Sequence, residues 1–182
     1  GLGSHFIKNV YPALKNNNNI KFISAYSPSK INQKTFKGIK IFKDLDTLIK
    51  EKEIKYYYIS NYTSLHYKTC LSLLKHNKNI ICEKPLTLNK NEFNHLIKLA
   101  IKNNLIILEA FMFKYHKNFI AIDNLLKKKR IGKIKSLNIK FTIPSLNKNN
   151  FRYNLSKGGG AFFDLGCYTV KMASLLVKSK IE

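Results

Sequence analysis

Acidic residues are scarce in this chain. Lys and Arg number 33 against 10 for Asp and Glu, which gives a formal charge of +23 over 182 residues. An excess of this size makes nucleic acid or another anionic surface a candidate partner. The lysines are scattered among Asn, Ile, Tyr and Phe, however, and do not form one stripe. A codon bias toward these residue types explains the composition better, so we expect no nucleic-acid partner; a basic chain would equally suit a phosphorylated cofactor.

Cysteines and long apolar runs are scarce as well. Cys70, Cys82 and Cys167 lie far apart and group neither with one another nor with the five histidines, which argues against a metal site. Buried free thiols in a reducing compartment, the cytoplasm, are the simplest interpretation. No apolar run is long enough to span a membrane, so we expect no membrane partner. The chain begins with Gly1 and not with Met, so the absence of a signal peptide is uninformative.

The sequence does contain an apolar fraction of 45%, which is enough for the core of one large domain or two small ones. Strands are predicted at 21–26, 38–42, 55–60, 80–82 and 105–108, and helices at 7–14, 45–52, 66–76 and 90–103. This alternation implies right-handed crossovers and a parallel sheet. Asp44 is a predicted helix cap, and we expect an apolar stripe of Phe93, Leu96, Ile97 and Ala100 in the core.

The chemistry is organised around residues 79–87. The apolar run at 80–82 is typical of a strand buried on both faces of a parallel sheet. Glu83 and Lys84 follow where that strand would meet solvent, and Pro85 removes an amide donor and ends the ladder. Because ligands of open α/β sheets bind beyond the carboxyl ends of the strands, this ionisable pair predicts a site. Taken alone, the stretch is better explained as a surface ion pair and a turn proline, and only its agreement with other stretches favours a site.

A glycine turn opens the chain. Gly1 and Gly3, followed by Ser4 and His5, lead into the first predicted helix. In a dinucleotide-binding fold such glycines let the backbone approach a pyrophosphate at the positive end of a helix, although one Gly-x-Gly pair is weak evidence. Phe6 replaces the usual small third residue and could crowd this turn. No strand precedes Gly1, so on this interpretation we expect a fragment cut just after its first strand.

Two further strand ends carry polar residues. The acid that binds the ribose hydroxyl in NAD enzymes, about 20 residues after the glycines, is missing. Ser27 and Lys30 instead offer a hydroxyl and a cation for a 2'-phosphate, which favours NADP over NAD, although an ordinary polar loop would look similar. After the strand at 55–60, Asn61 and His66 are predicted to contact the cofactor. A capping or surface role is the plainer alternative for His66.

The pattern changes beyond His116. A helix is predicted at 118–129, and a half-buried strand of a different sheet at 134–143, where apolar and polar side chains alternate. A polar loop with Arg152 then leads to glycines at 158–160 and a last helix. In that helix Asp164 and Tyr168 are spaced i, i+4 and are expected to project from one face.

These two residues suit hydride-transfer chemistry, because oxidising an alcohol needs a group that accepts the hydroxyl proton. Tyr168 could accept it if a lysine ammonium, for which Lys84 is the candidate, favoured the phenolate form. Asp164 could orient the substrate hydroxyl. The alternative is a glycine-rich turn in which Asp164 favours the helix dipole and Tyr168 is a core residue.

Together these motifs resemble the Gfo/Idh/MocA superfamily of oxidoreductases over essentially the whole chain. The resemblance rests on Gly1-x-Gly3, residues 60–66, Glu83-Lys84-Pro85, Glu109-Ala-Phe-Met112, Arg152 and Gly158-Gly-Gly-Ala-x-x-Asp164-x-Gly166-x-Tyr168. It implies an α/β fold: a Rossmann NAD(P)-binding domain over 1–115, then over 116–182 the start of an α+β domain with a mostly antiparallel sheet. Tyr168 and the 109–112 stretch resemble the branch containing glucose-fructose oxidoreductase and dimeric dihydrodiol dehydrogenase, which favours NADP.

The same resemblance implies roles for single residues. It places Lys84 beside the nicotinamide and substrate, within a cofactor-binding Glu83-Lys84-Pro85 stretch, and completes the active site with Asp164 and Tyr168. Phe113 and Arg152 are implied substrate contacts. For the full-length protein the resemblance also implies a homo-oligomer formed through the open face of the C-terminal sheet.

Three functions therefore remain open. The leading one is NADP-linked hydride transfer to or from a small-molecule substrate, namely a sugar, polyol or related hydroxy compound. The second is a family member that retains its cofactor for a redox-neutral reaction or acts as a non-catalytic sensor. The third is a basic nucleic-acid-binding module, whose affinity would fall steeply with salt.

Overall fold

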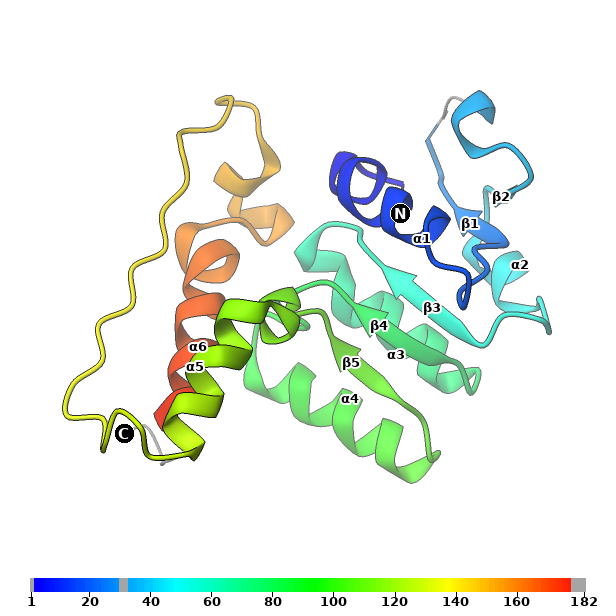
Figure 1. Cartoon of the computed structure of the whole chain (residues 1–182). Helices are drawn as coiled ribbons and strands as arrows, with labels where there is room; N and C mark the ends of the chain where they lie inside the picture. The colour runs from blue at the N-terminus through cyan, green and yellow to red at the C-terminus, as the bar shows by residue number, and fades with distance from the viewer. Residues whose placement is uncertain (1, 30–32, 178–182) are drawn as a thin grey trace. The chain divides into compact units, whose positions relative to one another are not determined.

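The computed structural model describes residues 2–29 and 33–177 (Figure 1). Gly1 and Lys30, both predicted to bind the cofactor, lie outside the described residues. The chain forms two compact units, Gly1–Glu109 and Ala110–Glu182. All strands found in the described residues belong to the first unit.

The strands of the first unit are short and parallel. They are β1 (Ser24–Tyr26), β2 (Lys40–Phe42), β3 (Tyr56–Ile59), β4 (Asn79–Cys82) and β5 (Ile107–Glu109). β1 pairs with β2, and β4 lies between β3 and β5, each pair in parallel register. The predicted parallel arrangement is thus confirmed. No ladder joins β1 to β3 within the described part of the chain, so each of the two sheets has an open edge there.

Helical segments connect these strands, and their ends follow from the local sequence. They are η1 (Phe6–Val10, a π-helix), α1 (Tyr11–Lys15), the 3-10 turns η2 (Gln33–Phe36) and η3 (Thr63–Leu65), α2 (Leu45–Ile49), α3 (His66–Lys75) and α4 (Lys90–Lys102). Asp44 caps α2 as predicted, because its carboxylate accepts the Thr47 N–H at 2.7 Å. Asn89 caps α4 by accepting the Glu92 N–H at 2.9 Å. α3 and α4 lie side by side (Figure 1).

The core of the first unit is formed by the β3–β4–β5 sheet with α3 and α4. Its fully buried side chains include Leu73, Leu74, Ile80 and Leu96. Cys70 and Cys82 are free and buried in this core, as predicted, and burial raises the pKa of the Cys82 thiol well above its ordinary value. The thiol of Cys82 therefore stays protonated and packs as a small apolar group. Cys167, in the second unit, is also free but only half-buried.

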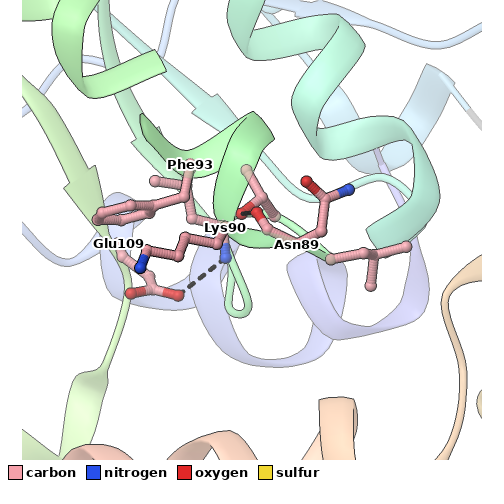
Figure 2. Close-up of a pocket in the computed structure, with 7 residues that line it drawn as sticks. Asn89, Lys90, Phe93 and Glu109 are labelled. Atoms are coloured by element: carbon pink, nitrogen blue, oxygen red, sulfur yellow. Dashed lines mark hydrogen bonds between the residues drawn. The ribbon is translucent and has the colours of Figure 1, made fainter. Parts of the chain in front are cut away.

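Phe93 departs from its predicted core position. Leu96 and Ala100 are buried, but 42% of Phe93 is exposed. The apolar stripe determines which face of α4 is apolar, not how far neighbouring elements cover that face. At the first turn of α4 the neighbours are residues 86–90 and Glu109, which together with Phe93 line an open hollow (Figure 2). The prediction for Phe93 is therefore wrong.

The regular elements of the second unit are all helical in its described residues, and residues 128–150 form none. Its elements are η4 (Met112–Tyr115), α5 (Lys117–Lys127), η5 (Phe151–Tyr153), η6 (Leu155–Lys157), η7 (Phe162–Gly166, a π-helix) and α6 (Cys167–Val177). The strand predicted at 134–143 is not formed, and no antiparallel sheet occurs among the described residues. A strand needs a neighbour to complete its ladder, and no described segment pairs with 134–143.

One segment of the second unit, Leu155–Val177, is long and apolar enough to cross a membrane by length and composition alone. The expectation that no such run exists is therefore wrong by this measure. Its four glycines, Lys157, Asp164 and Lys171 interrupt the apolar residues, so an unbroken run was not visible in the sequence. The measure is weak evidence for a membrane, because a helix covered by another part of a protein passes it equally well.

Candidate active site

Three segments of the first unit meet at Glu83, the first residue after β4. Its N–H donates to the Ile59 carbonyl at 2.9 Å. One oxygen of its carboxylate accepts a hydrogen bond from the Tyr58 hydroxyl and lies 3.2 Å from His5 Nε2, which is ion-pair distance. The predicted glycine turn and the predicted Glu83-Lys84-Pro85 stretch, far apart in the sequence, are therefore neighbours. Lys84 is half-buried and is joined to Pro85 by a cis peptide bond.

No other part of the described chain packs against the backbone of Gly3 at the place of a side chain. The helix begins at Ser4, and a Cβ atom added at Gly3 would meet no heavy atom within 4 Å. Phe6, which could have crowded this turn, is only 3% exposed and packs against Phe22 and Tyr58, with ring centroids 5.5 and 5.9 Å away. The Phe6 ring is therefore part of the core and leaves the space at Gly3 clear.

Ser27 lies directly after β1 and is buried. Its hydroxyl donates to the Ser29 carbonyl at 3.3 Å. Lys43 Nζ donates to the same carbonyl at 2.6 Å, so an ammonium lies at the turn predicted to bind a 2'-phosphate. Sequence analysis missed Lys43. The available signal was its place directly after the strand at 38–42, because the carboxyl ends of adjacent parallel strands lie together.

Asn61 and His66 follow β3. Asn61 Nδ2 donates to Thr69 Oγ1 at 2.9 Å, while Asn61 Oδ1 is buried without a hydrogen-bond partner in the described residues. His66 is 1% exposed; its Nδ1 lies 2.7 Å from the Pro85 carbonyl oxygen and its Nε2 lies 3.3 Å from the Asn61 carbonyl oxygen. Burial lowers the pKa of His66, an effect that these carbonyls and the Glu83 carboxylate oppose. The imidazole is therefore neutral near pH 7.

Arg152 and Asp164, predicted to contact substrate, are brought together in the second unit. Arg152 Nε lies 2.9 Å from Asp164 Oδ2, and the guanidinium lies over the Phe151 ring, 4.8 Å from its centroid. The glycine-rich turn approaches the same segment, since the Gly160 N–H donates to the Arg152 carbonyl at 2.8 Å. A Cβ atom at Gly159 would lie 2.5 Å from the Arg152 carbonyl oxygen, so no side chain fits at Gly159.

Tyr168 and Phe113 belong to an aromatic cluster of the second unit. The Tyr168 ring centroid lies 5.6 Å from that of Phe111, 6.1 Å from Phe113 and 5.2 Å from Phe141. A cavity of ≈ 610 Å³ is lined by Phe113, Phe141 and Tyr168 with further apolar side chains, and by the polar residues His116, Lys140 and Thr169.

Asp164 and Tyr168 were predicted to project from one helix face. Asp164 pairs with Arg152, whereas Tyr168 packs in the aromatic cluster. Asp164 lies in the π-helix Phe162–Gly166, whose hydrogen bonds join residues five apart, and Tyr168 follows in α6.

Two family models match this chain. An oxidoreductase family with an NAD-binding Rossmann fold matches residues 1–111, and a GFO/IDH/MocA C-terminal domain matches residues 119–182. A dTDP-3,4-didehydro-2,6-dideoxy-alpha-D-glucose 3-reductase of Streptomyces violaceoruber is 31% identical over 137 residues, covering 75% of this chain and 40% of that protein. A trans-1,2-dihydrobenzene-1,2-diol dehydrogenase of Xenopus laevis is 31% identical over 137 residues, covering 75% and 41%.

The chain also resembles a solved structure of an oxidoreductase. A 3-ketoreductase from Actinomadura kijaniata, crystallised in complex with NADP and TDP-benzene, has a TM-score of 0.89 and 26% identity, covering 97% of this chain and 55% of that one. The chain spans about 40% of the length of the curated relatives described above. Since the Rossmann-domain model alone matches more than half of its residues, the chain belongs to the Gfo/Idh/MocA family of NAD(P)-dependent oxidoreductases.

Proposed function

We propose that the protein transfers a hydride between the nicotinamide of NADP and a CH–OH carbon of a sugar, a polyol or a related hydroxy compound. The observation that carries this proposal is the contact of His5 with Glu83, which makes the glycine turn and the Glu83-Lys84-Pro85 stretch neighbours. Dinucleotides of open α/β folds bind at this place, beyond the carboxyl ends of the strands. Family membership and the reductase and dehydrogenase relatives support the same reaction.

The described residues fit a dinucleotide. The clear space at Gly3, next to a helix N-terminus, suits a pyrophosphate. The buried acceptor Asn61 Oδ1, which has no partner in the described part of the chain, would be satisfied by a donor on the cofactor. Ser27 and Lys43 would hold the 2'-phosphate.

When bound, the cofactor accepts or supplies the hydride, and side chains of this chain handle the proton. We assign Tyr168 Oη as the atom that takes the proton of the substrate hydroxyl in oxidation and returns it in reduction. A lysine ammonium near the phenol would favour its phenolate form, and Lys84 is the residue that we propose for this role. Asp164, held by Arg152, orients the substrate hydroxyl through its carboxylate.

The substrate we favour is a six-membered ring that carries a hydroxyl or keto group. By their names, the two relatives act on a dTDP-linked keto sugar and on a dihydrodiol of benzene, both of which contain such a ring. In this chain Phe113, Phe141 and Tyr168 supply flat apolar surfaces against which a ring face can pack. Trans-1,2-dihydrobenzene-1,2-diol is therefore the first substrate to assay.

Cofactor choice tests the proposal directly. In a fluorescence titration we expect saturable binding of NADPH and weaker binding of NADH. Lys43→Met should weaken NADPH binding by about tenfold, as expected for a charge-assisted hydrogen bond, and leave NADH binding unchanged. Lys37→Met, which removes an exposed lysine before β2, is the matched control and should change neither affinity. Preference for NADH would refute the 2'-phosphate pocket, and binding of neither cofactor would refute the proposed function.

We also propose that residues 134–143 form a strand of a mostly antiparallel sheet in the full-length protein, and that a homo-oligomer forms through the open face of that sheet. Alternating side chains at 134–143 and the match of 119–182 to the C-terminal domain support this arrangement. Amides of 135–143 should then exchange slowly with solvent, and sedimentation should give an oligomer mass. Rapid exchange at these amides would exclude the strand, and a monomer mass would exclude the oligomer.

A further inference from the structure

The loop that carries Lys84 is fastened by bonds to its main chain. The Glu83 N–H donates to the Ile59 carbonyl of β3 at 2.9 Å, and the Pro85 carbonyl oxygen lies 2.7 Å from His66 Nδ1. The Leu86 N–H donates to Glu109 Oε1 at 2.8 Å. Strand pairing cannot supply the last two bonds, because both ladders of β4 end at Cys82. The side chains of His66 and Glu109, from α3 and β5, supply these two bonds instead.

His66 reaches the loop from the first residue of α3. Its ring is 1% exposed, and both nitrogens face main-chain carbonyls, Pro85 at 2.7 Å and Asn61 at 3.3 Å. A neutral imidazole carries one N–H, and the shorter distance assigns it to Nδ1. The His66 side chain therefore holds the loop after β4 to the first turn of α3, through the Nδ1–H that it donates to the Pro85 carbonyl.

Glu109 reaches the same loop from the other neighbour of β4. It is the last residue of β5, pairs with Cys82 in the parallel register, and accepts the Leu86 N–H (Figure 2). Leu86 is 2% exposed, so an unpaired N–H there would be costly. Lys84 thus lies in a loop that is held from both sides of β4.

We propose that His66 and Glu109 are positioning residues that hold the main chain of residues 83–86 and thereby set the position of the Lys84 ammonium. This inference rests on the proposed function only in the experiments that measure turnover, and the hydrogen-exchange experiments do not depend on it. A displacement of about 1 Å in a catalytic group can lower the rate by about 100-fold, so loss of either support should lower kcat. Neither residue need touch the cofactor, so the dissociation constant for NADPH should stay near its wild-type value.

Variants of His66 separate its two ring nitrogens. The side-chain amide nitrogen of His66→Asn can occupy the place of Nδ1, whereas that of His66→Gln can occupy the place of Nε2. With trans-1,2-dihydrobenzene-1,2-diol and NADP as substrates of the full chain, we expect kcat to fall by about 100-fold in His66→Leu and His66→Gln. His66→Asn should recover most of that loss, because it restores the donor to Pro85. Leu73→Val, a packing change in the same helix, is the control and should leave kcat unchanged.

Variants of Glu109 give a readout that does not depend on turnover. Glu109→Gln keeps an oxygen that accepts the Leu86 N–H, whereas Glu109→Leu removes it. Hydrogen exchange of the Leu86 amide, followed by NMR, should be at least tenfold faster in Glu109→Leu and unchanged in Glu109→Gln. In His66→Leu the amides of Lys84 and Leu86 should also exchange faster.

Each outcome decides between definite alternatives. Weaker NADPH binding in His66→Leu with unchanged kcat would make His66 a cofactor contact and overturn its positioning role. An equal loss of kcat in Leu73→Val would reduce the role to general core packing. If the wild type binds NADPH but turns over no hydroxy compound, the proposed function fails, and the exchange rates of Leu86 still decide whether the two side chains hold the loop. Unchanged exchange in both leucine variants would overturn the inference.

Discussion

Lys84→Met is expected to lower kcat by at least about 100-fold while the dissociation constant for NADPH stays within about twofold of the wild type, the pattern of a lost proton-handling group. Met has nearly the length and the apolar stem of Lys but neither its charge nor its N–H donors. The bonds that hold the loop end on main-chain atoms of Glu83, Pro85 and Leu86, so the variant should keep the loop in place.

The control for this variant is Lys90→Met, the same exchange at an exposed lysine at the start of α4. It should leave both kcat and NADPH affinity unchanged. Turnover that survives in Lys84→Met would remove Lys84 from the chemistry. A wild type that binds NADPH without turning over any hydroxy compound would instead favour the redox-neutral or sensor alternative, for which binding alone would persist in Lys84→Met.

Gly3→Ala is expected to weaken NADPH binding by at least tenfold without lowering the stability of the fold. The added methyl group would meet no heavy atom of the protein within 4 Å, so folding has no reason to oppose it. The space it fills is the place proposed for the pyrophosphate, and a loss of about 1.4 kcal/mol of binding free energy is already tenfold in affinity.

Gly159→Ala is the matched control for Gly3→Ala, because the same methyl group would lie 2.5 Å from a main-chain oxygen of Arg152. Overpacking of this kind costs about 1–3 kcal/mol of folding free energy. Urea unfolding followed by circular dichroism should therefore show a lower midpoint for Gly159→Ala and an unchanged one for Gly3→Ala. Wild-type NADPH affinity in Gly3→Ala would mean that the pyrophosphate does not use this turn.

The strands and the ionisable loop of the first unit could be predicted because local sequence determines them. The apolar run at 80–82 ends at Glu83 in the sequence and in the structure, since a buried strand tolerates no charge. Asp44 was recognisable as a helix cap because its bond partner, the Thr47 N–H, is only three residues away in the sequence. Lys43 was missed although its place directly after the strand at 38–42 was visible, because its relevance depends on the pairing of β1 with β2, which one strand pattern alone does not contain.

Predictions that depend on which other segment packs or pairs with a residue were less successful. The alternation at 134–143 shows two distinct faces, but no described segment pairs with it, so no strand forms. Phe93 lies on the apolar face of α4 and is nonetheless exposed, because at the first turn that face borders the hollow lined by residues 86–90 and Glu109.

The bonds that hold the loop after β4 also bear on redesign. Every residue type except proline has the same main-chain N–H and C=O groups, so hydrogen bonds to the main chain do not depend on which side chain the residue carries. The side chain at position 84 can therefore be exchanged without loss of these bonds. A histidine, tyrosine or cysteine placed there would have the same fixed backbone. New chemistry could be installed at this position without rebuilding the fold around it.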